Sequence, residues 1–109
     1  MMDERRCHSR YPVSVPGRCA QPGQPEASIQ VLNLSAASLL ARSPQPFLQL
    51  KAAHLRVELQ EGLVECKAVC VRATTVPPWE GAFLFTEVAP ESAERLESFL
   101  ERLGGQGHP

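Results

Sequence analysis

Apolar side chains recur at every second position through most of the chain, and this spacing constrains the fold more than any other feature. Across residues 54–60, for example, Leu55, Val57 and Leu59 alternate with polar neighbours. Such alternation is typical of a β-strand with one face in the core and the other in solvent. Strands are predicted at residues 11–19, 27–34, 38–42, 54–60, 63–73 and 82–88. We therefore expect a mainly β protein made of short antiparallel strands.

The spacing changes to that of a helix after residue 90. Apolar residues then fall at i, i+3, i+4 and i+7, on one helical face. These residues are Leu96, Phe99, Leu100 and Leu103. Pro90 suits the first turn of such a helix, and Gly104-Gly105 is expected to end it. Strands followed by one helix suggest a small closed barrel capped by that helix, but length and alternation also permit an open sandwich.

Prolines and glycines mark the irregular places in this scheme. Pro12 and Pro16 lack backbone donors, so the first strand is expected to lie at an edge or to be irregular. Glu61-Gly62 is predicted to be a hairpin turn, and residues 75–81 a loop. Trp79 lies in that loop, where it either covers an end of the barrel or contacts a partner.

The composition favours one globular domain, because 109 residues with 43% hydrophobic content can bury a single modest core. A net charge of −1 argues against bulk binding of nucleic acid, which needs a basic surface. No stretch is apolar for long enough to span a membrane, and the N-terminus lacks the apolar core of a signal peptide. We therefore expect a cytoplasmic protein.

The cysteines do not form a metal or disulfide pattern. Cys19, Cys66 and Cys70 are expected to be buried, unreactive thiols, since there is no C-x-x-C pair and the cytoplasm keeps thiols reduced. Cys7 is flanked by arginines, which can lower a thiol pKa, so a redox role is a minor hypothesis for it. His8 and His54 have no Cys or Asp partner at metal-binding spacing. We assign no metal, no cofactor and no enzymatic activity.

Three arginines crowd into six positions near the N-terminus: Arg5, Arg6 and Arg10. A fold gains nothing from such crowding, because the charges repel one another. An anion gains a good deal, since each guanidinium is a planar fork that suits phosphate and purine edges. The structural alternatives are a solvated terminus or ion pairs with surface carboxylates, each worth at most about 1 kcal/mol.

A second polar stretch, Asn33-Leu34-Ser35-Ala36-Ala37-Ser38, follows the second predicted strand. Together the two stretches resemble the paired signature of the PilZ domain family. Arg6 and Arg10 match its R-x-x-x-R motif. Asn33 and Ser35 match its [D/N]-x-S-x-x-G motif, with Ser38 in the place of the glycine. The resemblance covers roughly residues 4–103, and the segment beginning at Gly81 looks like the family's last strand.

This resemblance implies a six-stranded antiparallel β-barrel, the PilZ-like split barrel, with a C-terminal helix. The expected organisation is a flexible arm at residues 1–10, the barrel and helix at residues 11–103, and a disordered tail at residues 104–109. Members of the family are receptors for cyclic di-GMP (c-di-GMP), a bacterial second messenger, so the resemblance also implies a bacterial protein. A chain of this length would be a stand-alone PilZ protein, either a monomer or a homodimer.

The resemblance also implies which residues bind the nucleotide: Arg5, Arg6, Arg10, Asn33, Ser35 and Ser38. Their chemistry suits it, because arginine can pair with guanine O6 and N7 or clamp a phosphate. Asn33 offers an acceptor to guanine N–H groups, and Ser35 offers a hydroxyl. Alternatively, Asn33 and Ser35 cap a turn through bonds to the backbone.

Ser38 leaves two functions open. If the family glycine serves a positive φ angle, serine costs about 1–2 kcal/mol there. If the glycine lets the ligand approach, a hydroxymethyl group obstructs it. The first function is a c-di-GMP receptor and adaptor that relays the signal to an unidentified protein partner. The second is a degenerate PilZ-like interaction module that binds no nucleotide. Independently of Ser38, a third alternative is an unrelated small barrel that uses its basic arm on nucleic acid.

Overall fold

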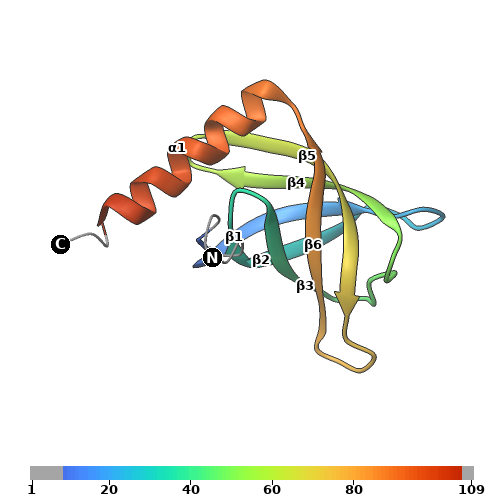
Figure 1. The fold of residues 1–109 in the computed structure, drawn as a ribbon. Helices are drawn as coiled ribbons and strands as arrows, with labels where there is room; N and C mark the ends of the chain where they lie inside the picture. Colours follow the sequence, from blue (N-terminus) through green and yellow to red (C-terminus); the bar gives the residue numbers. More distant parts are fainter. Residues whose placement is uncertain (1–8, 107–109) are drawn as a thin grey trace, which may run out of the picture.

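The computed structural model describes residues 9–106, in which six antiparallel strands close into one barrel (Figure 1). The strand order around the barrel is β1-β2-β3-β6-β5-β4. The elements are β1 (Tyr11–Ala20), β2 (Ala27–Leu34), β3 (Ser38–Ser43), β4 (Ala52–Leu59), β5 (Gly62–Ala73), β6 (Trp79–Val88) and α1 (Pro90–Gln106). Of the two architectures that alternation permits, the closed barrel is therefore correct.

The barrel interior is filled by the apolar residues that the alternation places on one face. Leu55 and Val57 of β4 are buried, and so are Val64, Cys66 and Cys70 of β5. The expected core is therefore confirmed for these two strands.

One contact of the core depends on a glycine. The ring of Phe83 in β6 meets Phe47 edge to face, with ring centroids 5.2 Å apart. A Cβ atom at Gly81 would lie 2.7 Å from the Phe47 ring, so glycine is needed there for the ring to pack against β6.

Cys19, Cys66 and Cys70 are free and buried, as predicted. Burial raises the pKa of the Cys19 and Cys66 thiols to about 12. Burial also raises the pKa of Cys70. These thiols therefore stay protonated and unreactive at neutral pH. Cys7 and His8 lie outside the described residues.

Strand β1 is irregular where its prolines lie. It pairs with β2 along most of its length, but with β4 only over its last residues, from Gly17 to Ala20. Pro12 and Pro16 precede this part, so their lack of a backbone N–H leaves no carbonyl of β4 without a hydrogen-bond donor. The register with β2 also shifts between Pro12 and Val15. Of the two predicted alternatives, the irregular strand is confirmed, whereas β1 is not an edge strand because it lies between β2 and β4 in the closed barrel.

Two connections differ from the sequence-based expectation. The loop predicted at residues 75–81 is shorter, because β6 begins at Trp79 and pairs there with Ser43 of β3. Thr74 closes this hairpin by accepting a hydrogen bond from the Glu80 N–H at 2.9 Å. The turn between β4 and β5 is Gln60-Glu61 rather than Glu61-Gly62, since Gly62 already pairs with Leu59. Trp79 is half-buried at the start of β6.

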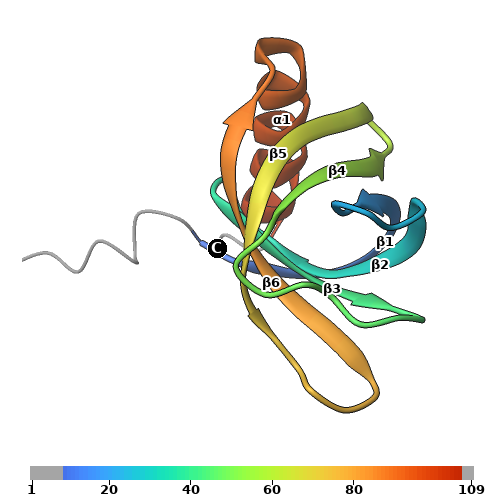
Figure 2. The same ribbon diagram turned by 90° about the vertical axis from the view of Figure 1, so that its right-hand side faces the viewer.

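Helix α1 packs against β5 beside one end of the barrel (Figure 2). Leu96 and Phe99 are buried, and Leu100 and Leu103 are packed against the core, as predicted. Three polar contacts fix the helix: the Ser92 hydroxyl accepts from Glu65 N–H at 2.9 Å, Arg95 donates to the Leu63 carbonyl at 2.8 Å, and Arg102 pairs with Glu61 at 2.9 Å. Within residues 9–106 no helix is long and apolar enough to cross a bilayer.

The predicted helix end at Gly104-Gly105 is wrong. The helix continues to Gln106, so residues 104–106 belong to it rather than to the expected tail. A Cβ atom at Gly104 would lie 2.8 Å from the Tyr11 hydroxyl oxygen. Glycine here permits close packing against the start of β1 and does not terminate the helix.

Candidate ligand-binding site

Of the six predicted site residues, the structure describes four, and these lie around the end of β2 and the start of β3. Arg10 directly precedes β1, Asn33 lies near the end of β2, and Ser38 begins β3. Ser35 lies in the turn between β2 and β3. Arg5 and Arg6 lie outside the described residues.

Arg10, Asn33 and Ser38 line a common hollow of about 280 Å³. Its wall is built by β3, β6 and β5, chiefly through Leu40, Val71, Arg72, Ala82 and Leu84. The structure therefore brings together three of the six predicted residues at an open, mixed polar and apolar surface. This hollow is the candidate site.

Asn33 reaches the hollow through a break in the β2 alternation. Ile29 and Val31 point into the core, and simple alternation would send Asn33 there too. The register between β2 and β3 shifts between Val31 and Asn33, so the next buried residue is Leu34. This bulge turns Asn33 outward.

Asn33 then begins a row of paired residues across four strands. It pairs with Leu40 of β3, Leu40 pairs with Ala82 of β6, and Ala82 pairs with Arg72 of β5. Neighbouring strands lie about 4.8 Å apart, so the row is about 14 Å long. Asn33 and Arg72 stand at its two ends.

Arg72 is a candidate residue that the sequence did not reveal. Alternation places it on the same face as Cys66 and Cys70, which are buried. A register shift between Cys70 and Arg72 turns the guanidinium outward instead, and Arg72 is exposed. Only the strand pairing reveals this position, because a bulge leaves no clear mark in a strand of this composition.

Ser35 has a structural role in the turn. Its side chain is 1% exposed. Its hydroxyl oxygen accepts hydrogen bonds from the N–H groups of Ala37 at 3.1 Å and Ser38 at 3.0 Å. The Ser35 N–H also donates to the Ser38 carbonyl at 2.9 Å. Ser35 thus fixes the backbone that leads into β3, and it is not among the residues that line the hollow.

Ser38 is not strained by its backbone. Within residues 9–106, Leu50 is the only non-glycine residue with a positive φ, so Ser38 has an ordinary conformation. It pairs with Leu84 as the first residue of β3. Its hydroxyl lies 3.0 Å from that of Ser35. Any effect of serine in place of the motif glycine is therefore one of space in the hollow.

The charges around the hollow differ from those elsewhere on the barrel. Arg18, Arg42, Arg56 and Arg102 each pair with a glutamate, and Arg95 donates to a carbonyl. Arg10 and Arg72 have no such partner within residues 9–106, and both line the hollow. Two guanidinium groups with no carboxylate partner among the described residues therefore lie at this one place, which favours an anion there.

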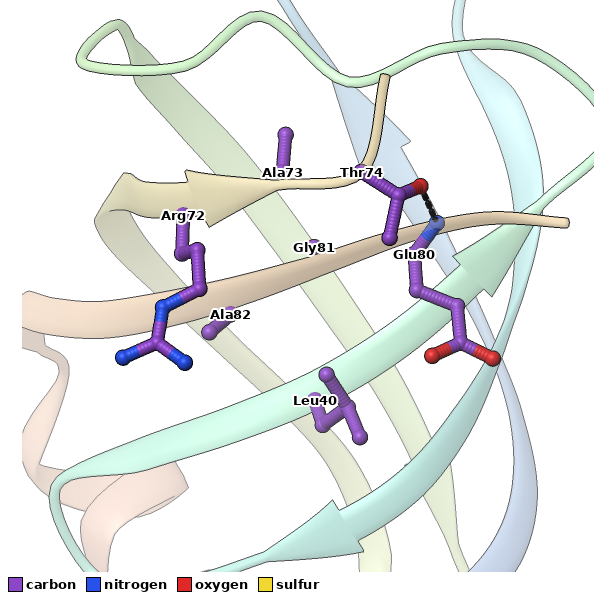
Figure 3. A pocket seen from close by; sticks show the side chains of 7 residues that line it. All are labelled: Leu40, Arg72, Ala73, Thr74, Glu80, Gly81 and Ala82. Carbon is purple, nitrogen blue, oxygen red and sulfur yellow. Dashed lines mark hydrogen bonds between the residues drawn. The ribbon is translucent and has the colours of Figure 1, made fainter. Parts of the chain in front are cut away.

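A second hollow of about 230 Å³ shares Leu40, Arg72 and Ala82 with the first. Figure 3 shows the side chains that line this second hollow. The Glu80 carboxylate lies at its far end and pairs with Arg42 at 2.6 Å. This carboxylate makes the second hollow less suitable for an anion. No group of three His, Cys, Asp or Glu side chains that could hold a metal ion occurs in residues 9–106.

Comparison with solved structures identifies the architecture. The Bacillus subtilis inhibitor of motility (MotI/DgrA) superposes with a TM-score of 0.77 at 16% identity, over 94% of this chain and 52% of that protein. The PilZ domain of Escherichia coli YcgR, solved with c-di-GMP, gives 0.73 at 14% identity, over 94% and 93% of the two chains. The K. pneumonia MrkH–c-di-GMP complex gives 0.67 at 14% identity, over 96% of this chain and 54% of MrkH.

These similarities establish the PilZ-domain fold for the chain, as the sequence motifs implied. The chain spans about half the length of MotI/DgrA and of MrkH, and nearly all of the separate YcgR domain. No protein-family model matches the sequence, and no curated protein matches it significantly.

Proposed function

We propose that the protein is a PilZ-type receptor for c-di-GMP. The observation that carries the proposal is the hollow where Arg10, Asn33 and Ser38 meet, because these residues come from both halves of the motif pair. The solved YcgR domain and MrkH, which share the fold, both contain c-di-GMP. Guanidinium groups that pair with no carboxylate of residues 9–106, beside an apolar wall, suit a ligand that has phosphates and purine rings.

Each residue has a distinct role in this proposal. Arg10, with Arg5 and Arg6 from the same segment, pairs with a phosphate or with guanine O6 and N7. The Asn33 side chain accepts a hydrogen bond from a guanine N–H. The Ser38 hydroxyl faces the same ligand. Ser35 contributes chiefly by holding the turn, since its hydroxyl already accepts two backbone hydrogen bonds.

The signal then passes to a protein partner, in the cytoplasm, without any chemical reaction. Arg10 is followed directly by Tyr11, whose hydroxyl lies against Gly104 of α1. A ligand that binds Arg10 therefore acts directly beside a residue that contacts the helix. In this view the protein is an adaptor, and the surface that changes includes the end of α1.

A second candidate function is an interaction module that binds no nucleotide. The observation in its favour is Ser38, whose half-buried side chain lies at the hollow and is held there by the Ser35 hydroxyl. A hydroxymethyl group at this place takes up space that the motif glycine leaves to the ligand.

Calorimetric titration of c-di-GMP into the whole chain distinguishes the two functions. The variants are wild type, the double variant Arg6→Ala/Arg10→Ala, and Ser38→Gly. The receptor predicts micromolar or tighter binding by wild type and its loss in the double variant. The module predicts no heat from wild type, and binding that appears only in Ser38→Gly. Absence of binding by all three folded proteins would overturn the nucleotide hypothesis.

A further inference from the structure

We infer that Arg72 is a second anchor for the ligand, outside both sequence motifs. The inference rests on the proposed function and extends its site across the barrel wall to β5. Among the arginines of residues 9–106, Arg72 and Arg10 are the two that no carboxylate or carbonyl of these same residues engages. Both line the same hollow.

The two ends of the site are far enough apart to bind different parts of one large ligand. Arg72 and Asn33 stand at opposite ends of one cross-strand row, about 14 Å apart along the wall. A ligand with one charged group would meet only one end. A molecule that carries two phosphates and two purine rings can meet Asn33 and Arg10 at one end and Arg72 at the other.

The surface between the ends is apolar, which suits a purine face. Leu40 and Ala82 occupy the middle of the row. Leu84 and Val71 flank it and are 48% and 39% exposed, which is unusual for large apolar residues of this chain. A planar base lying on these side chains would cover them, while the Arg72 guanidinium can stack on the ring or pair with its edge.

The charge distribution decides which hollow Arg72 serves. The Glu80 carboxylate at the far end of the second hollow repels a phosphate, even though Arg42 partly neutralises it. The first hollow has Arg10 and no lining carboxylate among the described residues. An anionic ligand therefore draws the Arg72 side chain toward Arg10 and Asn33.

The test is c-di-GMP affinity, measured by calorimetry for Arg72→Gln, Arg72→Lys and the matched control Arg56→Gln. Arg56 is an exposed arginine on β4 that lines neither hollow, and its replacement changes the net charge equally. We expect Arg72→Gln to weaken binding about tenfold or more, because a charged hydrogen bond is lost. Arg72→Lys retains the charge without the planar fork and should weaken it less. Arg56→Gln should stay within about twofold of wild type.

Several results would overturn the inference. In one such result, wild type binds c-di-GMP, Arg6→Ala/Arg10→Ala does not, and Arg72→Gln binds as tightly as wild type. The protein would then be a receptor, but Arg72 would not contact the ligand. Equal losses in Arg72→Gln and Arg56→Gln would mean that only overall charge matters. If folded wild type does not bind c-di-GMP, both the role of Arg72 and the proposed receptor function are wrong. Melting curves of each variant confirm folding, which an exposed position should not affect.

Discussion

Asn33 and Arg72 lie at the two ends of one row of paired residues across β2, β3, β6 and β5, and each faces outward because a bulge precedes it. In a regular strand both side chains would point into the core, in line with Val31 and Cys70. A buried amide and a buried guanidinium without partners would destabilise the barrel strongly. The bulges convert both positions into parts of one outer surface.

The first prediction concerns Ser35, which fixes the turn between β2 and β3. Ser35→Ala removes the acceptor of two backbone N–H groups at a buried position, so we expect a loss of about 1–3 kcal/mol in the free energy of unfolding. Ser28→Ala, at an exposed position of β2, is the matched control and should change little. Urea denaturation measures both, and equal stability of Ser35→Ala and wild type would contradict the role of Ser35 in the turn.

The second prediction concerns the contact between Gly104 and Tyr11. Because alanine has a higher helix propensity than glycine, Gly104→Ala would by itself be expected to stabilise α1 by up to about 1 kcal/mol. The new Cβ atom, however, would lie 2.8 Å from the Tyr11 hydroxyl oxygen, so we expect Gly104→Ala to destabilise the protein instead. Adding Tyr11→Phe removes that oxygen and should restore stability. A higher melting temperature for Gly104→Ala alone would show that the contact is absent in solution.

The third prediction concerns Leu50, whose φ angle is 66° and whose side chain is 71% exposed. A left-handed conformation costs a leucine about 1–2 kcal/mol, and this exposed side chain recovers little of it by packing. Replacing Leu50 with glycine relieves this strain but adds entropy to the unfolded chain, which offsets part of the gain. The net effect of Leu50→Gly should be a rise of up to about 1 kcal/mol in the free energy of unfolding. Leu63→Gly, within β5 and free of this strain, should lower it. Chemical denaturation of the two variants gives the signs directly.

The fourth prediction concerns the buried thiols and alkaline pH. The pKa of Cys66 is raised from 9.0 to about 12 because the folded barrel desolvates the thiolate. Unfolded chains therefore lose this proton first as the pH rises, and the stability contributed by the neutral thiol is full below pH 9 and declines between pH 9 and about 12.

Thiol labelling checks the same burial at pH 8. Iodoacetamide should leave Cys19, Cys66 and Cys70 unmodified in the folded protein and react with them after denaturant is added. Mass spectrometry of the peptides identifies the modified residues, and rapid native labelling of Cys66 would contradict its burial.

The regular parts of the fold could be predicted from the sequence, because they follow a fixed period. Leu55 and Val57 on β4, and Leu96 and Phe99 on α1, are buried where periods of 2 and 3.6 place them. The prediction of a closed barrel, by contrast, rested on the motif resemblance, because alternation also permits an open sandwich. Closure depends on β1 meeting β4, and Gly17 allows it, since a Cβ atom there would lie 2.5 Å from the Arg56 carbonyl oxygen.

The site was only partly predictable, because it depends on departures from the period. The motifs predicted Arg10, Asn33 and Ser38 as site residues, and the structure places these three at one hollow. The position of Arg72 could not be predicted from the sequence, because its side chain points outward as a result of a register shift in β5. The glycines at the end of α1 were misinterpreted for a related reason: a glycine needed for packing and a glycine that ends a helix look the same in a sequence.

The most direct test of the site is a titration of the ¹⁵N-labelled chain with c-di-GMP, followed by two-dimensional NMR. If c-di-GMP binds in this hollow, the amides of Asn33, Ser38, Leu40, Ala82 and Arg72 should shift saturably, with smaller changes at the end of α1. The amides around Arg18 and Arg56, on the β1–β4 side of the barrel, should stay unchanged. Shifts that centre on that side, or a spectrum unaltered by excess ligand, would show that c-di-GMP does not bind in this hollow.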